Sequence, residues 1–474
     1  MKVRLLLFLL TALTTALFAQ DNYEITIEIE GYDQPELYLA YSIMDKQYIA
    51  DTATVNDAGK FVFSSATSEL PRGIYLVVLA PDNVYFQILV GSEKDQVFSL
   101  KTEVDNLSDV AVKSSPENQL FFEYMDYLSQ QQEKVAPIRT ELADSSLTDI
   151  QRAELEEVME VIDKEVSGYQ NNLVQQYPES FLSAIIKANA PNPPPAYEDI
   201  ADEEERNTKK LIWLREHYFD NIDLQDDRLL RTPFLFSRIN YFVDKLFVQH
   251  PDTISQAIDQ VLMQMDPRSE LFQNYVVHFV NKAAGSKIVG MDAVYVHMVD
   301  NYYANGRAYW ADKESVDKMI AQVAKIRPLL IGKDAPNMQM KRRDGTPVEL
   351  YDIKANYTVL YFWQFACGSC KKATPVMKEF YAKWKDKGVE IFSVCTKQGE
   401  IDKCWEYVDE KGIGDWLHAT DRFMRFYKDY DIRSTPSIFV LDENKKIVSK
   451  RIGASQLDEL LTALEKQKEA EKGK

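Results

Sequence analysis

The spacing of hydrophobic and polar positions changes twice along the chain. From residue 22 to about residue 110, short runs alternate between apolar and polar residues. A period of two is typical of strands with one buried face. Turn-forming residues separate the runs, for example Asn56-Asp57-Ala58-Gly59. About seven strands at this spacing predict a β-sandwich. The expected strands are 24–30, 36–43, 47–55, 60–64, 73–79, 84–90 and 96–101.

From about residue 115 to 325, apolar residues recur at helical spacing. The stripe Leu235, Ile239, Phe242 and Leu246 is one example, and such a stripe indicates a helix that faces a core. The middle of the chain is therefore predicted to be all-α. Four histidines lie here, but none has a partner at the i, i+4 spacing of a helical zinc site. We expect no metal site and no cofactor.

Beyond residue 346, strands and helices alternate, which indicates an α/β domain. A lead-in at residues 326–346, with clustered Pro and Gly, precedes it. The chain is thus predicted to be multidomain, with a β-sandwich at 20–112, an all-helical domain at 113–326 and an α/β domain at 327–474. Its expected elements are strand 357–363, helix 370–385, strand 389–395, helix 403–411, the strand pair 437–441 and 446–451, and helix 456–469.

Residues 1–19 have the pattern of a secretory signal. Lys2 and Arg4 precede an apolar run that extends to Ala19 and contains no acidic residue. The run is interrupted by threonines and is shorter than the roughly 20 apolar residues that span a bilayer. We expect cleavage after Ala19, no stable membrane insertion afterwards, and export from the cytoplasm.

Net charge and cysteine placement limit the function further. The 474 residues carry a formal charge of −19, which argues against nucleic-acid binding. All four cysteines, Cys367, Cys370, Cys395 and Cys404, lie in the last quarter of the chain. Disulfides therefore do not hold the first 360 residues together, and the cysteines point to chemistry.

Cys367-Gly368-Ser369-Cys370 stands where an apolar strand turns into a helix. At a helix N-terminus, unpaired backbone N–H groups and the helix dipole stabilise a thiolate, so Cys367 is the expected nucleophile. Cys370 is close enough to attack a mixed disulfide on Cys367 and release the product. No second cysteine pair with zinc-ligand spacing follows.

In these residues the sequence resembles the thioredoxin superfamily, and more narrowly its exported TlpA/ResA-like thiol-disulfide oxidoreductases. The resemblance covers about residues 330–470 and includes Phe362-Trp363, Pro375, Ser434-Thr435-Pro436 and Gly453. It implies a thioredoxin-like fold in which Pro436 is cis and faces the dithiol. It also implies that the backbone of Thr435 pairs with an extended substrate segment. Trp363, Thr435 and Pro436 are then the expected substrate-binding residues.

Two positions depart from the pattern of the superfamily. Thioredoxins carry a buried Asp where this chain has Tyr361, and some exported relatives carry a Glu where it has Ala373. A water molecule, another carboxylate or Tyr361 could accept the proton of the resolving thiol, or resolution could be slow. The residues leave these alternatives open.

The upstream segments resemble the paired domains of unknown function that precede thioredoxin domains in exported proteins of Bacteroidetes-type bacteria. The matching residues are Asp57, Gly59 and Phe61, together with 177–181. This resemblance implies a periplasmic protein and supplies no activity for those domains. Cys395 and Cys404 could be two buried thiols or could form a second disulfide, and the sequence leaves both alternatives open.

The favoured function is a periplasmic thiol-disulfide oxidoreductase that exchanges its dithiol with exported proteins and is served by a thiol-disulfide electron donor. A thiol peroxidase is one alternative, although Gln364 and Leu360 replace the Thr and Pro of peroxiredoxins. A partner-binding protein with an ancillary redox domain is the other.

Overall fold

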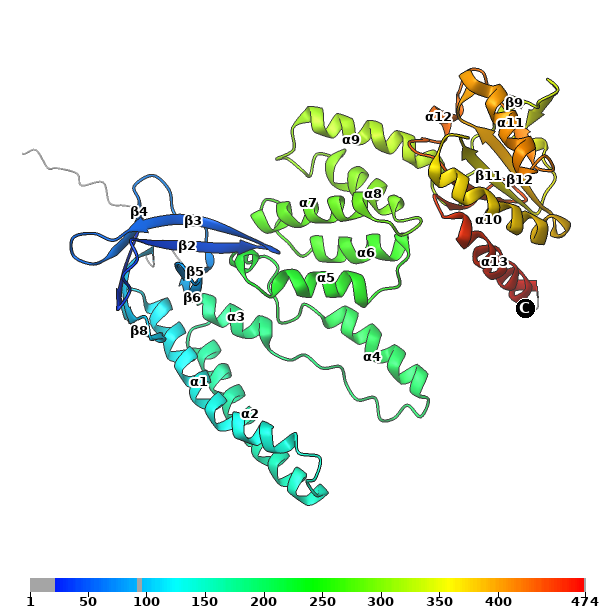
Figure 1. Cartoon of the computed structure of the whole chain (residues 1–474). Helices are drawn as coiled ribbons and strands as arrows, with labels where there is room; N and C mark the ends of the chain where they lie inside the picture. The colour runs from blue at the N-terminus through cyan, green and yellow to red at the C-terminus, as the bar shows by residue number, and fades with distance from the viewer. Residues whose placement is uncertain (1–21, 92–95, 473–474) are drawn as a thin grey trace, which may run out of the picture. The chain divides into compact units, whose positions relative to one another are not determined.

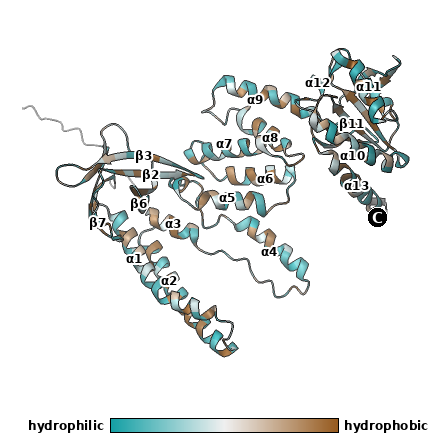
Figure 2. Ribbon diagram, in the orientation of Figure 1, coloured by the Kyte–Doolittle hydropathy of each residue, from teal (hydrophilic) through white to brown (hydrophobic). Residues whose placement is uncertain are grey.

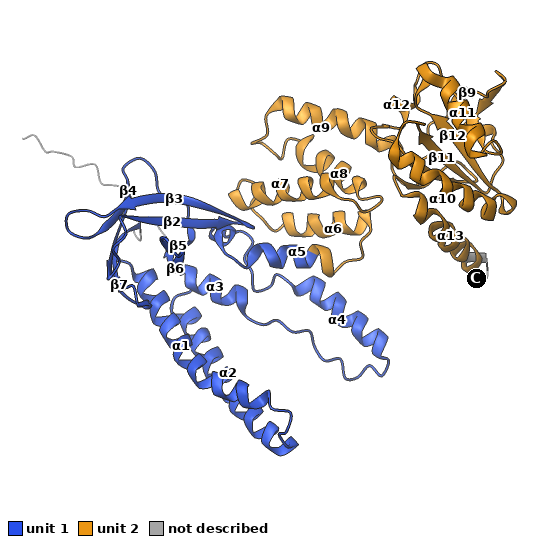
Figure 3. Cartoon of the chain, in the orientation of Figure 1, with its two compact units in different colours: residues 1–242 blue, residues 243–474 orange. Residues whose placement is uncertain are grey.

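The computed structural model describes residues 22–91 and 96–472, so the predicted signal segment lies outside the described residues. The chain divides into two compact units, residues 1–242 and 243–474 (Figure 3). The three-domain borders expected from the sequence stay predictions. In the part of the chain that is described, no helix has the length and apolarity needed to cross a membrane.

The first unit begins with a β-sandwich, as expected. Among the described residues it has two four-stranded sheets, in the orders β4-β1-β7-β8 and β3-β2-β5-β6. Alternate residues of β1 (Tyr23, Ile25, Ile27 and Ile29) are buried in the core. The strands are β1 Tyr23–Glu30, β2 Glu36–Ile43, β3 Lys46–Thr54, β4 Phe61–Ser65, β5 Gly73–Leu79, β6 Val84–Val90, β7 Val97–Glu103 and β8 Asn106–Lys113.

The sequence pattern did not indicate β8. In this strand only Val110 is buried, so it lacks the apolar alternation that marks the other strands. Its place is fixed by antiparallel pairing with β7.

Helices complete the first unit (Figure 1). Hydrophobic and hydrophilic residues are interspersed along α1 and α2 (Figure 2). The buried side chain of Asn118 near the start of α1 bonds both the N–H and the C=O of Leu89, at 2.8 Å each, which ties the helix to β6. The helices are α1 Pro116–Leu142, α2 Asp149–Gln176, α3 Phe181–Asn189 and α4 Glu203–His217, and α5 Leu235–Lys245 runs across the border between the units.

The second unit starts with more helices, which confirms the helical middle region. The stripe on α5 is buried, as a core-facing stripe should be. The helices are α6 Pro251–Leu262, α7 Glu270–Gly285, α8 Asp292–Met298 and α9 Lys313–Ile326.

An α/β domain with a thioredoxin-like fold follows. A five-stranded sheet has the order β13-β12-β11-β14-β15, in which β11 is parallel to β12 and antiparallel to β14. Separate hydrophobic clusters involve alternate residues of β11, so this strand is buried on both faces. The elements are β9 Gln339–Lys341, β10 Pro347–Glu349, β11 Tyr357–Trp363, α10 Gly368–Trp384, β12 Val389–Cys395, α11 Ile401–Lys411, β13 Leu417–Ala419, α12 Phe426–Asp429, β14 Ser437–Asp442, β15 Ile447–Lys450 and α13 Leu457–Lys472.

A buried ion pair joins this domain to the helices of the same unit. Lys450 of β15 is 4% exposed, and its Nζ donates to Asp292 of α8 and to the carbonyl oxygen of Leu329. Burial lowers the pKa of Lys450, and the charge and hydrogen bond of Asp292 oppose this shift. The buried Lys450 charge on β15 therefore finds its ion-pair partner only where the α/β domain contacts α8 of the helical segment.

Candidate active site

The site forms where the central strand of the sheet ends. All seven residues of β11 are buried, and the chain leaves the sheet after Trp363 to enter α10. Trp363 pairs in parallel register with Cys395, the last residue of β12. Because parallel strands end at the same edge of a sheet, all four cysteines come from segments that meet near this edge.

Cys367 is the N-cap residue of α10. Its Sγ accepts a hydrogen bond from the backbone N–H of Cys370 at 3.3 Å, in the manner of a capping side chain. The helix dipole adds positive potential at the same point. The sequence motif therefore places a sulfur atom where the backbone stabilises its anion.

The two thiols differ in exposure and acidity. Cys367 is partly exposed, whereas Cys370 is completely buried, and neither is bridged in this structure. Burial acts to raise the pKa of Cys367, but hydrogen bonds from Cys370, Thr435 and Ser369 outweigh it and lower the pKa. Burial is the largest cause that raises the pKa of Cys370, to about 12. The site thus pairs an accessible acidic thiol with a buried weakly acidic one.

The loop before β14 faces the dithiol. The Thr435–Pro436 peptide bond is cis, which confirms the expectation from the family resemblance. Cys367 Sγ donates to the carbonyl oxygen of Thr435 at 3.2 Å. Gln364 Nε2 donates to Thr435 Oγ1 at 3.1 Å, which is a second contact between this loop and the segment that leads to the dithiol. Sequence reasoning did not assign Gln364 this contact, because its partner lies 71 residues away along the chain.

Trp363 has a different position from the other expected substrate-binding residues. It is 1% exposed, and its indole Nε1 donates to Ser393 Oγ at 2.7 Å in the core. This position favours a role in holding the end of β11. A direct contact of Trp363 with substrate stays a prediction.

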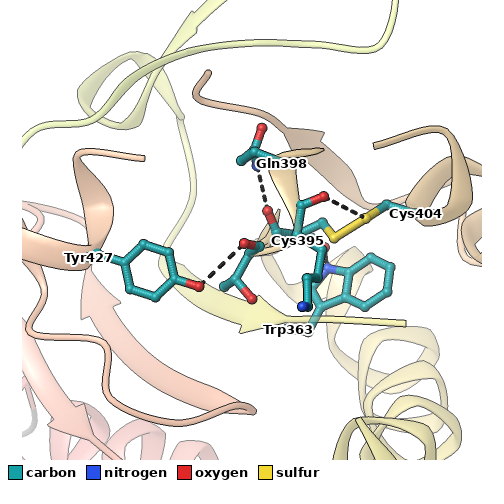
Figure 4. Close-up of a disulfide and its surroundings, with 8 residues drawn as sticks. Trp363, Cys395, Gln398, Cys404 and Tyr427 are labelled. Carbon is teal, nitrogen blue, oxygen red and sulfur yellow. Dashed lines mark hydrogen bonds between the residues drawn. A yellow bond between two sulfur atoms is a disulfide. The ribbon is translucent and has the colours of Figure 1, made fainter. Parts of the chain in front are cut away.

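Cys395 and Cys404 form a disulfide, which settles the alternatives that the sequence left open. The bridge joins the end of β12 to α11 and closes the loop between them (Figure 4). Inside this loop, the backbone N–H of Thr396 donates to the carbonyl oxygen of Trp363 at 2.7 Å. Tyr427 Oη donates to the carbonyl oxygen of Thr396 at 3.3 Å, and Gln398 bonds the carbonyl oxygen of Cys395. The bridged loop is therefore anchored beside the strand that leads to the dithiol.

Among the described residues, no group of three or more His, Cys, Asp or Glu side chains could hold a metal ion. An accessible thiolate can attack a disulfide, and a second thiol three residues on can complete the exchange.

Comparison with known proteins agrees with this geometry. Residues 331–450 match the AhpC/TSA family, and residues 23–121 and 151–326 match two domains of unknown function, DUF4369 and DUF5106. The thiol-disulfide oxidoreductase ResA of Bacillus thuringiensis is 30% identical over 160 residues, which cover 34% of this chain and 84% of that protein.

Solved structures are also similar to the chain. A domain of a possible thiol-disulfide isomerase from Cytophaga hutchinsonii is 38% identical, covers 30% of this chain and 98% of its own, and has a TM-score of 0.29. A thioredoxin-like protein from Bacteroides caccae is 17% identical over 57% of this chain and 98% of its own, with a TM-score of 0.38.

The fold and its cysteine pair define the chain as a thiol-disulfide oxidoreductase with a thioredoxin-like domain. Within that class, the chain belongs to the ResA-like thiol-disulfide oxidoreductases.

Proposed function

We propose that the chain exchanges the Cys367/Cys370 dithiol with disulfides of exported proteins in the periplasm. The single observation that carries this proposal is the contrast between the two thiols. Cys367 is partly exposed and has a lowered pKa, while Cys370 is buried beside it.

The reaction proceeds in two transfers. The Cys367 thiolate attacks one sulfur of the substrate disulfide and forms a mixed disulfide, and the other substrate sulfur leaves as a thiolate that takes a proton from water. Cys370 then loses its proton to water and attacks Cys367 Sγ, and the second substrate sulfur leaves in the same way. Two electrons pass to the substrate, and a thiol-disulfide electron donor must reduce the pair again.

Thr435, Pro436 and Trp363 are the proposed substrate-binding residues. The Thr435 carbonyl oxygen already faces Cys367 Sγ, so a substrate strand laid along this loop would bring its sulfur to the nucleophile. Export is supported by the signal-like pattern of residues 1–19. Cell fractionation and N-terminal sequencing of the mature chain should find it in the periplasm, starting at Gln20.

Reduction of insulin disulfides by the reduced chain tests the activity. The wild type should reduce insulin, and Cys367→Ala should be inactive. Cys370→Ala should accumulate mixed disulfides on Cys367, and the proteins trapped in this way from a periplasmic extract identify the substrates. Hydrogen-peroxide consumption without insulin reduction would instead support a peroxidase and contradict the proposal.

A further inference from the structure

The helical part of the second unit contains a cavity that thiol-disulfide exchange does not use. Its volume is about 240 Å³, and every residue that lines it belongs to the second unit. Residues of α5, α6, α7 and α8 supply most of its wall, and the segment between α7 and α8 supplies the rest. Of these helices, α6, α7 and α8 pack against one another (Figure 1). The floor of the cavity consists of buried apolar side chains, namely Val243, Ile254, Ile258, Phe279, Met291 and Val294.

The size and lining of this cavity favour an apolar occupant. An apolar cavity of about 150 Å³ stays dry and binds benzene, because water finds too few polar partners there. The cavity between the helices is larger than this. It therefore has room for an aromatic ring or a branched aliphatic chain together with a few further atoms. The apolar part of a fitting ligand is thus about as large as a large amino-acid side chain.

An ion pair stands at the mouth of the cavity. Lys282 Nζ of α7 donates to both carboxylate oxygens of Asp244 on α5, at 2.8 and 2.6 Å. The two side chains are 36% and 37% exposed, whereas the residues of the floor are buried. The exposed residues Gln249 and Ser286 also line the cavity. An apolar floor is therefore combined with a polar entrance that carries one charge of each sign.

Two adjacent opposite charges suit a ligand that carries both signs itself. A ligand with a single charge would attract one member of the pair and repel the other. A free α-amino acid has an ammonium and a carboxylate group on the same carbon atom. Its carboxylate can accept a hydrogen bond from Lys282 while its ammonium donates one to Asp244. The side chain of a residue within a protein lacks these two charges, because its amino and carboxyl groups are part of peptide bonds.

We propose that the cavity binds a free α-amino acid with a large apolar side chain. The side chain lies on the apolar floor, the carboxylate pairs with Lys282, and the ammonium pairs with Asp244. This binding goes beyond the proposed function, because it involves neither thiol of the dithiol. It gives the helical segment a binding activity of its own.

Calorimetric titration of the full chain tests the proposal, with L-phenylalanine as the probe. A ligand of this size should bind with a dissociation constant of about 1 mM or lower. Three analogues separate the contributions of its charges. Phenethylamine lacks the carboxylate, 3-phenylpropionate lacks the ammonium, and N-acetyl-phenylalanine amide lacks both charges, as a side chain within a protein does. Each should bind at least about tenfold more weakly, as expected for the loss of a charge-assisted hydrogen bond.

Two variants locate the binding in this cavity. Lys282→Met keeps most of the side-chain length but removes the ammonium, and it should weaken phenylalanine binding about tenfold. Ala283→Leu places additional carbon atoms in the cavity and leaves the ion pair unchanged, so it should abolish binding. Lys313→Met is the matched control, because Lys313 forms a comparable pair with Asp317 at 2.8 Å on α9, away from the cavity. This control should bind phenylalanine as the wild type does.

No heat of binding up to about 10 mM phenylalanine would overturn the proposal. Equally tight binding of N-acetyl-phenylalanine amide would also overturn it and would make the cavity a docking site for a protein side chain. Wild-type affinity in both Lys282→Met and Ala283→Leu would place the binding elsewhere and refute the assignment. If Ala283→Leu does not fold, as circular dichroism would show, Lys282→Met and the analogues still decide.

Discussion

The reactivity of the two active-site thiols follows from their surroundings and can be given a magnitude. The pKa of Cys367 lies below its ordinary value of 9.0, and that of Cys370 is about 12. The two values therefore differ by at least about three. At neutral pH the thiolate fraction of Cys367 should exceed that of Cys370 by at least about a thousandfold, because each pKa unit changes the fraction tenfold.

A less acidic thiol is a stronger nucleophile, which offsets part of this difference. With a Brønsted coefficient of about 0.4 to 0.5, a three-unit difference gives the Cys370 thiolate an advantage of roughly 15- to 30-fold. The net preference for alkylation of Cys367 is then at least about 30-fold. The burial of Cys370 should increase it further, since the reagent must reach the sulfur.

The assay is timed alkylation of the reduced dithiol with iodoacetamide, followed by peptide mass spectrometry. Labelling of Cys367 should accelerate as the pH rises and level off once the pH passes its lowered pKa, below 9.0. Cys370→Ala serves as the control, because it must still be labelled at Cys367. Equal labelling of the two cysteines at neutral pH would refute the electrostatic reasoning and reverse their proposed roles.

Three further predictions concern the surroundings of the site. Gln364→Ala, which removes the contact with the Thr435 loop, should slow insulin reduction about fivefold, since one hydrogen bond contributes about 1 kcal/mol; an unchanged rate would mean that the loop holds its place alone. Replacing Cys395 and Cys404 by Ala should lower the unfolding free energy of the second unit in urea by roughly 2.5 kcal/mol, because the bridge closes a short loop; the Cys367→Ala/Cys370→Ala chain, whose thiols are not bridged, is the control. Asp292→Ala should cost roughly 3 kcal/mol in the same measurement by leaving the Lys450 charge buried and unpaired, and adding Lys450→Met should restore most of the loss.

Local sequence was sufficient for the elements that carry the dithiol. The strand Tyr357–Trp363 is apolar throughout and the Cys-x-x-C pair follows it directly, so both the strand and the start of α10 could be predicted. The strand β8 and the three-residue strand β13 could not. Their residues lack the alternation or the length that marks a strand, and pairing with a neighbour decides their structure.

The sequence by itself determined that a β-sandwich, a helical region and an α/β domain follow one another along the chain. It also determined the redox motif and which thiol stands at the helix N-terminus. Each of these depends on residues close together along the chain. Only the tertiary structure decided that Cys395 is bridged to Cys404 and that the Thr435 carbonyl oxygen meets Cys367. Such contacts join segments distant in sequence, and they form because burying the faces of β11 brings the segments to one edge of the sheet.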